Sequence, residues 1–185
     1  MDAFRDTRVL TEAALAIALA FVLGLITILK MPFGGSISLA MMPLILLALR
    51  QGPWVGMVAG VAYGLLNLAF EPVVVHPIQV LFDYPLAFGV LGLAGFFPPT
   101  VRGAIIGTIV AVAARFVCHF VSGVAFFASY APEGWNPAVY SAAYNAAYLV
   151  PSLVISLVVV VALLRALDGA QPSGRQLRYR RSAAL

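Results

Sequence analysis

Long apolar runs, separated by short polar breaks, divide the chain into six segments. A helix that crosses the hydrocarbon core of a bilayer needs about 20 apolar residues. Most of the runs are close to this length, but the second is much shorter. The pattern predicts helices over residues 9–29, 38–49, 54–70, 78–97, 101–127 and 139–167. We expect the short second helix to have an irregular start or to be enclosed by protein.

The breaks between these segments contain proline and glycine, as expected where helices end. The breaks are Lys30–Gly35, Arg50–Pro53, Glu71–Pro77, Pro98–Pro99 and Ser129–Pro137. Two further prolines, Pro85 and Pro151, fall inside predicted helices. Each of these two helices therefore loses one backbone hydrogen bond.

The composition agrees with the apolar pattern. Of the residues, 63% are hydrophobic and only 10% are charged, whereas a soluble domain is about a quarter charged. The sequence therefore predicts an all-α integral membrane protein, built as a bundle of six transmembrane helices, in the cell membrane of a prokaryote. Residues 1–170 form the membrane domain, and 171–185 form a basic cytoplasmic tail.

The net charge of +4 raises the possibility of a nucleic-acid partner, but the distribution of charge argues against it. An even number of crossings puts both termini on one side of the membrane. That side then carries most of the arginines, namely Arg5, Arg8, Arg50, Arg102, Arg165 and those of the tail, whereas Lys30, Glu71, His76 and Glu133 fall on the other. The positive-inside rule predicts that both termini are cytoplasmic.

Small residues recur every fourth position in two of the predicted helices. Gly52, Gly56, Gly60 and Gly64 form one ridge of the third helix, where a neighbouring helix can approach closely. In the first helix, Ala14 and Ala18 form a similar patch. For this alanine patch, internal packing and the docking of a partner both remain open at this point.

Ionisable residues inside a membrane span are costly and are therefore candidates for function. Glu12 lies near the cytoplasmic edge, where water or the helix N-terminus can satisfy it. Asp83 lies deeper and needs a cation or several hydrogen-bond donors. Its partner is either Arg115, in an internal ion pair, or a cationic ligand, and both are compatible with the sequence.

The last two predicted helices carry polar and aromatic residues on single faces. Arg115, His119, Gly123 and Phe127 are spaced by four, as are Tyr140, Tyr144 and Tyr148, with Asn145 beside them. Trp135 lies in the loop at the same, outer ends. The pattern predicts a cavity open to the outside that suits a flat, positively charged molecule, because aromatic faces attract cations.

Four segments resemble the thiamine-specific substrate-binding subunit of energy-coupling factor transporters. They are residues 35–43, 82–88, 115–123 and 140–145, and the similarity extends from about Leu10 to Leu167. The resemblance implies six helices, an outward-facing thiamine pocket formed by the C-terminal helices, and a cap formed by the loop after the first helix.

The resemblance also implies roles for individual residues. Carried over by position, the thiamine contacts fall on Asp83, Tyr84, His119, Gly123, Phe127, Tyr140 and Asn145; the residue pattern adds Tyr144 and Trp135. Two family tryptophans are replaced, one by Phe127 and one, in the first loop, by a residue near Gly34. We therefore expect the cap to use Phe33 or Trp135.

The resemblance further implies that Ala14 and Ala18 dock on a transmembrane coupling subunit. The sequence has no Gly-x-x-x-x-Gly-Lys-Ser/Thr phosphate loop, so two ATPase subunits would supply the energy. We expect no cofactor, no metal and no enzymatic activity. A stand-alone carrier that uses Asp83 and His119 as a proton relay remains an alternative, as does a binding subunit for another vitamin.

Overall fold

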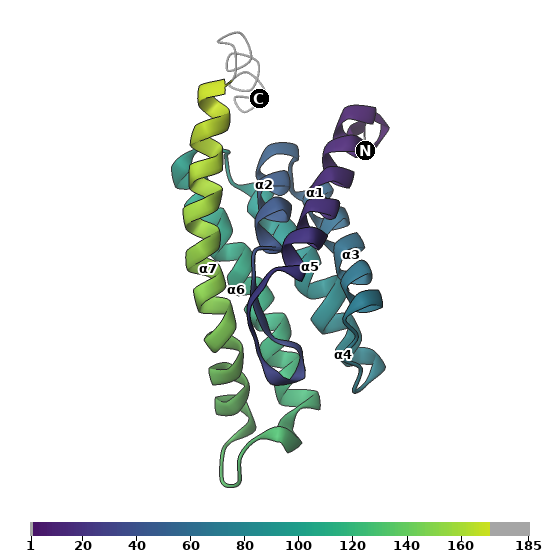
Figure 1. Cartoon of the computed structure of the whole chain (residues 1–185), viewed down its shortest axis with the longest axis vertical. Helices are drawn as coiled ribbons and strands as arrows, with labels where there is room; N and C mark the ends of the chain where they lie inside the picture. Colours follow the sequence, from purple (N-terminus) through teal and green to yellow (C-terminus); the bar gives the residue numbers. More distant parts are fainter. Residues whose placement is uncertain (1, 171–185) are drawn as a thin grey trace.

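Five helices of the computed structural model, which describes residues 2–170, are long and apolar enough to cross a membrane (Figure 1). They are α1 (Thr7–Leu25), α3 (Pro53–Phe70), a composite span from Pro77 to Phe96, α6 (Val101–Phe126) and α7 (Pro137–Ala170). The basic tail predicted for residues 171–185 lies outside the described residues.

The sixth helix, α2 (Met41–Gln51), has only 11 residues. At 1.5 Å per residue it is about 16 Å long, roughly half the thickness of the hydrocarbon core. Most of its side chains are buried, including Leu44 and Ile45. The structure thus confirms that the short second helix is enclosed by protein. Together the six helices form the predicted bundle.

The prediction that the first helix extends to residue 29 is wrong, because α1 ends at Leu25. The chain continues as strand β1 (Thr27–Lys30), turns at Pro32–Gly34, and returns as β2 (Ser36–Ser38), which pairs antiparallel with β1. Phe33 and Gly34 have φ of 63° and 102°, the left-handed conformation that reverses the chain. The second helix accordingly begins at Met41 and not at residue 38.

The fourth span is a series of different helical turns. It begins as α4 (Pro77–Leu81), continues as the π-helical turn η3 (Phe82–Leu86) and α5 (Ala87–Gly89), and ends as the 3-10 turn η4 (Val90–Phe96). Pro85 cannot donate the usual backbone hydrogen bond, and such π-helical turns occur frequently at functional sites. Asp83 and Tyr84 lie within this turn.

The predicted glycine ridge of α3 packs directly against this span. A Cβ atom built on Gly60 would lie 2.2 Å from the backbone oxygen of Phe88, and one on Gly64 would lie 2.5 Å from that of Tyr84. Real Cβ atoms do not approach so closely. The structure therefore confirms that small residues at these positions let the two spans meet backbone to backbone.

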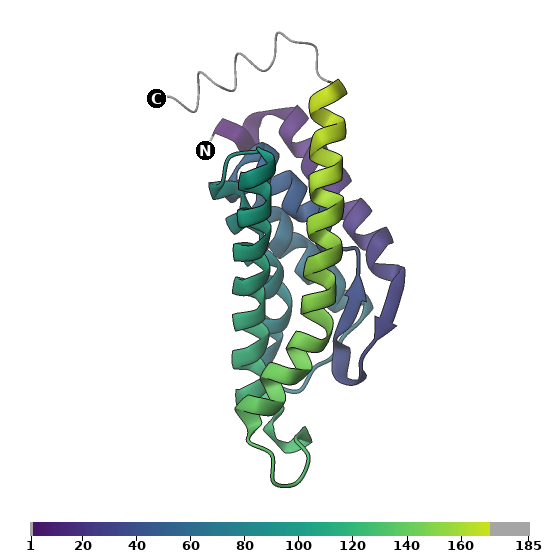
Figure 2. The same ribbon diagram turned by 90° about the vertical axis from the view of Figure 1, so that its left-hand side faces the viewer.

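The start of α1 and the end of α7 lie at the same end of the bundle (Figures 1 and 2). At this end Glu12 accepts a hydrogen bond from Gln51 Nε2 at 2.6 Å and lies 3.5 Å from Arg8 and 3.7 Å from Arg50. Side chains of Gln51, Arg8 and Arg50 therefore contribute to satisfying Glu12. The side of the membrane that this end faces stays a prediction.

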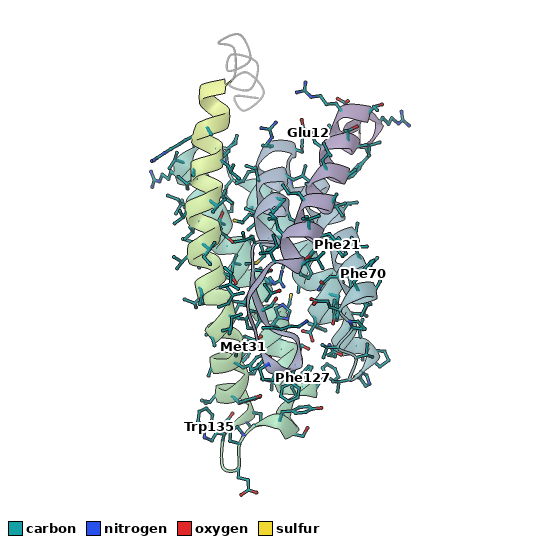
Figure 3. All side chains as sticks on the ribbon, viewed as in Figure 1. Glu12, Phe21, Met31, Phe70, Phe127 and Trp135 are labelled. Atoms are coloured by element: carbon teal, nitrogen blue, oxygen red, sulfur yellow. The ribbon has the colours of Figure 1, made fainter. Side chains whose placement is uncertain are left out.

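Apolar side chains project from the outer surface of the bundle (Figure 3). They include Leu15, Leu19 and Val22 on α1, Leu65 on α3 and Val158 on α7. Such an apolar surface needs lipid and not water around it. At this surface, Phe21 of α1 packs edge-on against the exposed Phe70 of α3 with ring centroids 4.8 Å apart, a contact between α1 and α3 near the strands.

Candidate functional site

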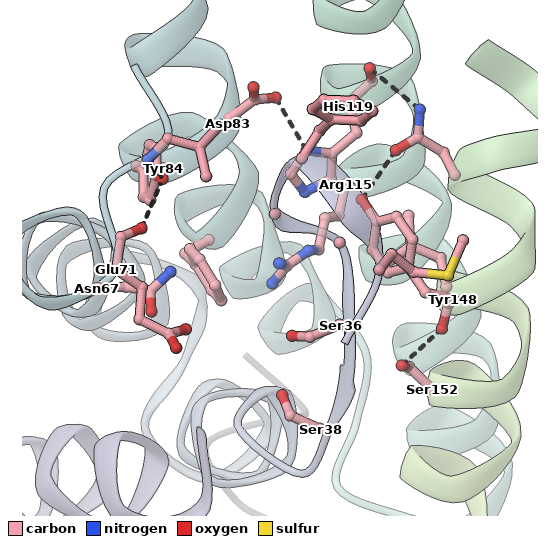
Figure 4. A pocket seen from close by; sticks show the side chains of 18 of the residues that line it. Ser36, Ser38, Asn67, Glu71, Asp83, Tyr84, Arg115, His119, Tyr148 and Ser152 are labelled. Atoms are coloured by element: carbon pink, nitrogen blue, oxygen red, sulfur yellow. Dashed lines mark hydrogen bonds and ion pairs between the residues drawn. The ribbon is translucent and has the colours of Figure 1, made fainter. Parts of the chain in front are cut away.

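A cavity of about 510 Å³ lies between the fourth span, α6 and α7, and the β1–β2 hairpin closes one side of it (Figure 4). The structure brings together at this cavity eight of the residues that the sequence predicted: Asp83, Tyr84, His119, Gly123, Phe127, Tyr140, Tyr144 and Asn145. They come from three separate segments of the chain between residues 83 and 145, so the fold itself creates the site.

Trp135 is the exception among the predicted residues. It lies in the loop before α7, 52% of its surface is exposed, and it does not line the cavity. Figure 3 shows it beyond the end of the bundle. Phe33, the other residue expected to cap the pocket, does line the cavity and packs on Tyr130 with ring centroids 4.4 Å apart.

The carboxylate of Asp83 is held by three donors. It accepts hydrogen bonds from His119 Nδ1 at 3.0 Å, from Ser122 Oγ at 2.9 Å and from Gln79 Nε2 at 2.7 Å. Such bonds to a charged oxygen are the strong kind and fix the carboxylate in place. The internal ion pair with Arg115, which the sequence allowed, does not form, because donors from α4 and α6 already surround the carboxylate.

This arrangement sets the chemistry of His119. An ionised carboxylate can only accept hydrogen bonds, so Nδ1 carries the proton and Nε2 is left as an acceptor. Nε2 is buried and has no hydrogen-bond partner within residues 2–170. His119 as a residue lines the cavity, so a ligand bound there is a candidate donor to this atom.

Arg115 lies on the same face of α6, one turn away from His119. Its guanidinium carbon sits 3.8 Å from the centre of the Phe88 ring, an arrangement in which the cation is attracted to the ring face. Only 9% of the residue is exposed, and it lines the cavity. Besides the Lys30–Glu71 pair, the cavity is therefore lined by the Asp83 carboxylate and the Arg115 guanidinium, which are not paired with each other.

Asn145 joins α6 to α7 behind these groups. Its Nδ2 donates to the backbone oxygens of Ser141 at 2.9 Å and His119 at 3.3 Å, and its Oδ1 accepts from the Tyr148 hydroxyl at 2.8 Å. The expected partners on both sides of the amide are present. Gly123 allows this close packing, since a Cβ there would lie 2.2 Å from Ser141 Oγ.

The β1–β2 hairpin is fastened to the cavity on two sides. The Tyr144 hydroxyl donates to the backbone oxygen of Pro32, within the turn. On the opposite side, Lys30 Nζ lies 2.7 Å from Glu71 Oε1. Gly35 packs on the Tyr148 ring, where a Cβ would come within 2.8 Å of two ring carbons. The hairpin thus covers the polar groups of the site.

Comparison with known proteins identifies the family of the chain. The family described as "Thiamine transporter protein" matches residues 10–171. A relative named thiamine transporter ThiT from Bacillus subtilis is 36% identical over 148 residues, which cover 71% of this chain and 77% of the relative. The ThiT of Lacticaseibacillus paracasei is 32% identical over 158 residues, with coverage of 76% and 79%.

The chain belongs to the thiamine transporter protein family. Its fold matches a solved structure of ThiT from Listeria monocytogenes with a TM-score of 0.77 and 31% identity, covering 85% of this chain and 93% of the other. It also matches a structure described as the S component of a bacterial ECF transporter, with a TM-score of 0.52, 20% identity and coverage of 88% and 94%. This second match shows a shared fold.

Sequence reasoning missed one central residue of this family member, Gln79. Only 1% of it is exposed, and its amide holds Asp83, donates to the backbone oxygen of Val73 at 3.1 Å and accepts from the Val75 N–H at 3.0 Å. The signal was present, because residues four apart share a helical face. Tyr84 also holds the loop before α4, since its hydroxyl donates to the backbone oxygen of Glu71 at 2.9 Å.

Proposed function

We propose that this chain binds thiamine in the cavity and is the substrate-binding subunit of a vitamin B1 uptake system. The observation that carries the proposal is the buried His119 Nε2, an acceptor held in position by Asp83 and left without a partner within residues 2–170. A ligand that brings an amino group to this atom satisfies it, and thiamine carries an amino group on its pyrimidine ring.

The remaining features of the cavity support the same ligand. The thiazolium ring of thiamine is positively charged, and the negative charge of Asp83 favours a cation in this low-dielectric site. Phe127, Tyr140 and Tyr144 offer ring faces to a flat heteroaromatic cation. A volume of about 510 Å³ is typical of pockets that enclose a small molecule.

We further propose that the chain works with a transmembrane coupling subunit and two ATPase subunits. The fold that it shares with an S component of an ECF transporter supports this assembly. So does the exposure of Ala14 and Ala18 on α1, because small residues on an outer face let a partner helix approach closely. Internal packing, the other interpretation of these alanines, does not apply to side chains that face outward.

Calorimetric titration of the purified protein with thiamine tests the binding proposal. Asp83→Asn and His119→Ala should each weaken binding by about 2 kcal/mol or more, roughly 30-fold, because each leaves buried polar groups unpaired. Asp6→Asn is the matched control: it removes the same charge at the N-cap of α1, far along the chain from the cavity, where asparagine caps equally well.

Two results would contradict the binding proposal. One is a wild-type protein that binds no thiamine. The other is a pair of cavity variants, Asp83→Asn and His119→Ala, that bind thiamine as tightly as Asp6→Asn does. Competition with riboflavin and biotin in the same titration tests the choice of vitamin, and we expect neither to displace thiamine.

A further inference from the structure

Arg115 carries a buried charge that forms no ion pair and no hydrogen bond in the described part of the chain. Its Nε and Nη1 atoms are buried and have no hydrogen-bond partner among residues 2–170. The two nearby carboxylates are engaged elsewhere: three donors surround Asp83, and Glu71 pairs with Lys30. An unpaired buried cation costs several kcal/mol, so a group that compensates it is expected.

The ring beneath the guanidinium does not supply this compensation. A cation over an aromatic face gains about 0.5–2 kcal/mol, which is less than the cost of burying the charge. The interaction with Phe88 also leaves the N–H groups of Arg115 without acceptors. These N–H groups need oxygen atoms in the plane of the guanidinium.

The guanidinium lies in the cavity on the side away from the Asp83–His119 pair. In the view of Figure 4 it sits between His119 and Ser36, with Ser38 beyond. Ser36 and Ser38, on β2 and at its end, line the same cavity. The cavity thus has an acidic end, which suits a cationic ring, and a basic end flanked by hydroxyl groups.

We propose that Arg115 is an oxyanion-binding subsite that takes a phosphate group next to the bound thiamine. A guanidinium binds phosphate through two parallel N–H···O bonds. The phosphate is either esterified to the hydroxyethyl tail of thiamine or is free inorganic phosphate bound beside it. The inference rests on the proposed function, because it assumes that thiamine occupies the acidic end.

Charge counting favours this occupant. Asp83 and Arg115 together contribute no net charge, and thiamine alone adds one positive charge to a site enclosed by protein and lipid. A phosphate monoanion at Arg115 restores neutrality, and opposite charges in such a medium attract strongly. A ligand with a cationic ring at one end and a phosphate at the other therefore matches both ends of the cavity.

Titration of wild type and Arg115→Gln with thiamine and with thiamine monophosphate, in phosphate-free buffer, tests the subsite. A second set of thiamine titrations contains inorganic phosphate. If the subsite binds a phosphate that is esterified to thiamine, Arg115→Gln weakens the binding of thiamine monophosphate at least tenfold more than the binding of thiamine. If the subsite binds free phosphate, added inorganic phosphate tightens the binding of thiamine to wild type but not to Arg115→Gln. Either result supports the subsite and identifies its source.

The matched control is Arg165→Gln, which removes an exposed arginine of α7 that does not line the cavity. It should change neither the relative affinity for thiamine and its monophosphate nor the effect of inorganic phosphate on thiamine binding. If Arg115→Gln does not fold, Arg115→Lys takes its place, because lysine keeps the charge but loses the paired N–H groups. Equal effects on both ligands, with no response to phosphate, would overturn the subsite alone. Wild-type protein that binds no thiamine would overturn the proposed function as well.

Discussion

A single amide, that of Gln79, connects the loop before α4 to the charged centre of the site. It holds the backbone of Val73 and Val75 in the loop before α4 and donates to the carboxylate of Asp83. Asp83 in turn orients His119. Gln79 therefore influences the position of the His119 Nε2 acceptor indirectly, through Asp83.

Replacing Gln79 by leucine tests this dependence. Gln79→Leu keeps the approximate volume but leaves the Val75 N–H unpaired and removes one donor from Asp83. We expect a loss of about 1–3 kcal/mol in the free energy of unfolding, measured by thermal denaturation in detergent, and thiamine binding weaker by several-fold.

Gln51→Leu provides the control for this variant. It removes an amide that donates to Glu12 at the opposite end of the bundle. It should lower stability and leave thiamine affinity unchanged. If both leucine variants bind thiamine equally well, Gln79 does not position the site.

At the scale of elements, the glycine ridge of α3 supports the π-helical turn that carries Asp83. Gly64 meets the backbone of Tyr84, the residue after Asp83, without any side chain between them. A π-helical turn interrupted by Pro85 has lost regular hydrogen bonds. The adjoining helix therefore fixes the path of this turn.

Gly64→Ala should consequently affect both stability and binding. Its Cβ would lie 2.5 Å from the Tyr84 backbone oxygen and 2.7 Å from its carbonyl carbon, so the turn must shift. Overpacking of this kind costs about 1–3 kcal/mol, measured by thermal denaturation, and calorimetry should show weaker thiamine binding. Ala62→Val, which adds atoms to the exposed face of the same helix, should change neither the thermal stability nor the affinity for thiamine. If Ala62→Val lowers both as much as Gly64→Ala does, the glycine ridge does not support the turn.

At the scale of the whole molecule, the surfaces proposed for binding and for coupling are separate. The cavity is formed mainly by α3, the fourth span, α6, α7 and the hairpin, and α1 contributes only Gly24 near its end, whereas Ala14 and Ala18 face outward on α1. Helix α1 packs on α2 and α3 and leaves most of its own surface to the surroundings. A change on its outer face therefore need not alter the cavity.

Ala14→Leu combined with Ala18→Leu should abolish thiamine uptake in vesicles that also contain the coupling and ATPase subunits. Bulky side chains prevent the close approach of a partner helix, while calorimetric titration should show unchanged binding. Ala69→Leu, on the exposed face of α3, should preserve both activities. Equal loss of uptake and binding in the double variant would argue against docking.

The sequence predicts most of the fold because every span except the short α2 is an apolar run of membrane length. It does not predict the hairpin, because residues 27–29 continue the apolar run of α1 and become a strand only by pairing with Ser36–Ser38. At the site, helical spacing was sufficient to group Arg115 with His119. The partners of Asp83 depend on the π-helical turn, and the place of Trp135 depends on a loop path, neither of which follows from periodicity.

The exposure of Trp135 has a practical consequence for spectroscopy. The chain has two tryptophans; Trp54 is 68% exposed and Trp135 is 52% exposed, and neither lines the cavity. Their emission reports on the surroundings of the bundle. Five tyrosines line the cavity instead, Tyr63, Tyr84, Tyr140, Tyr144 and Tyr148, so quenching experiments that follow a ligand in the cavity should monitor tyrosine emission.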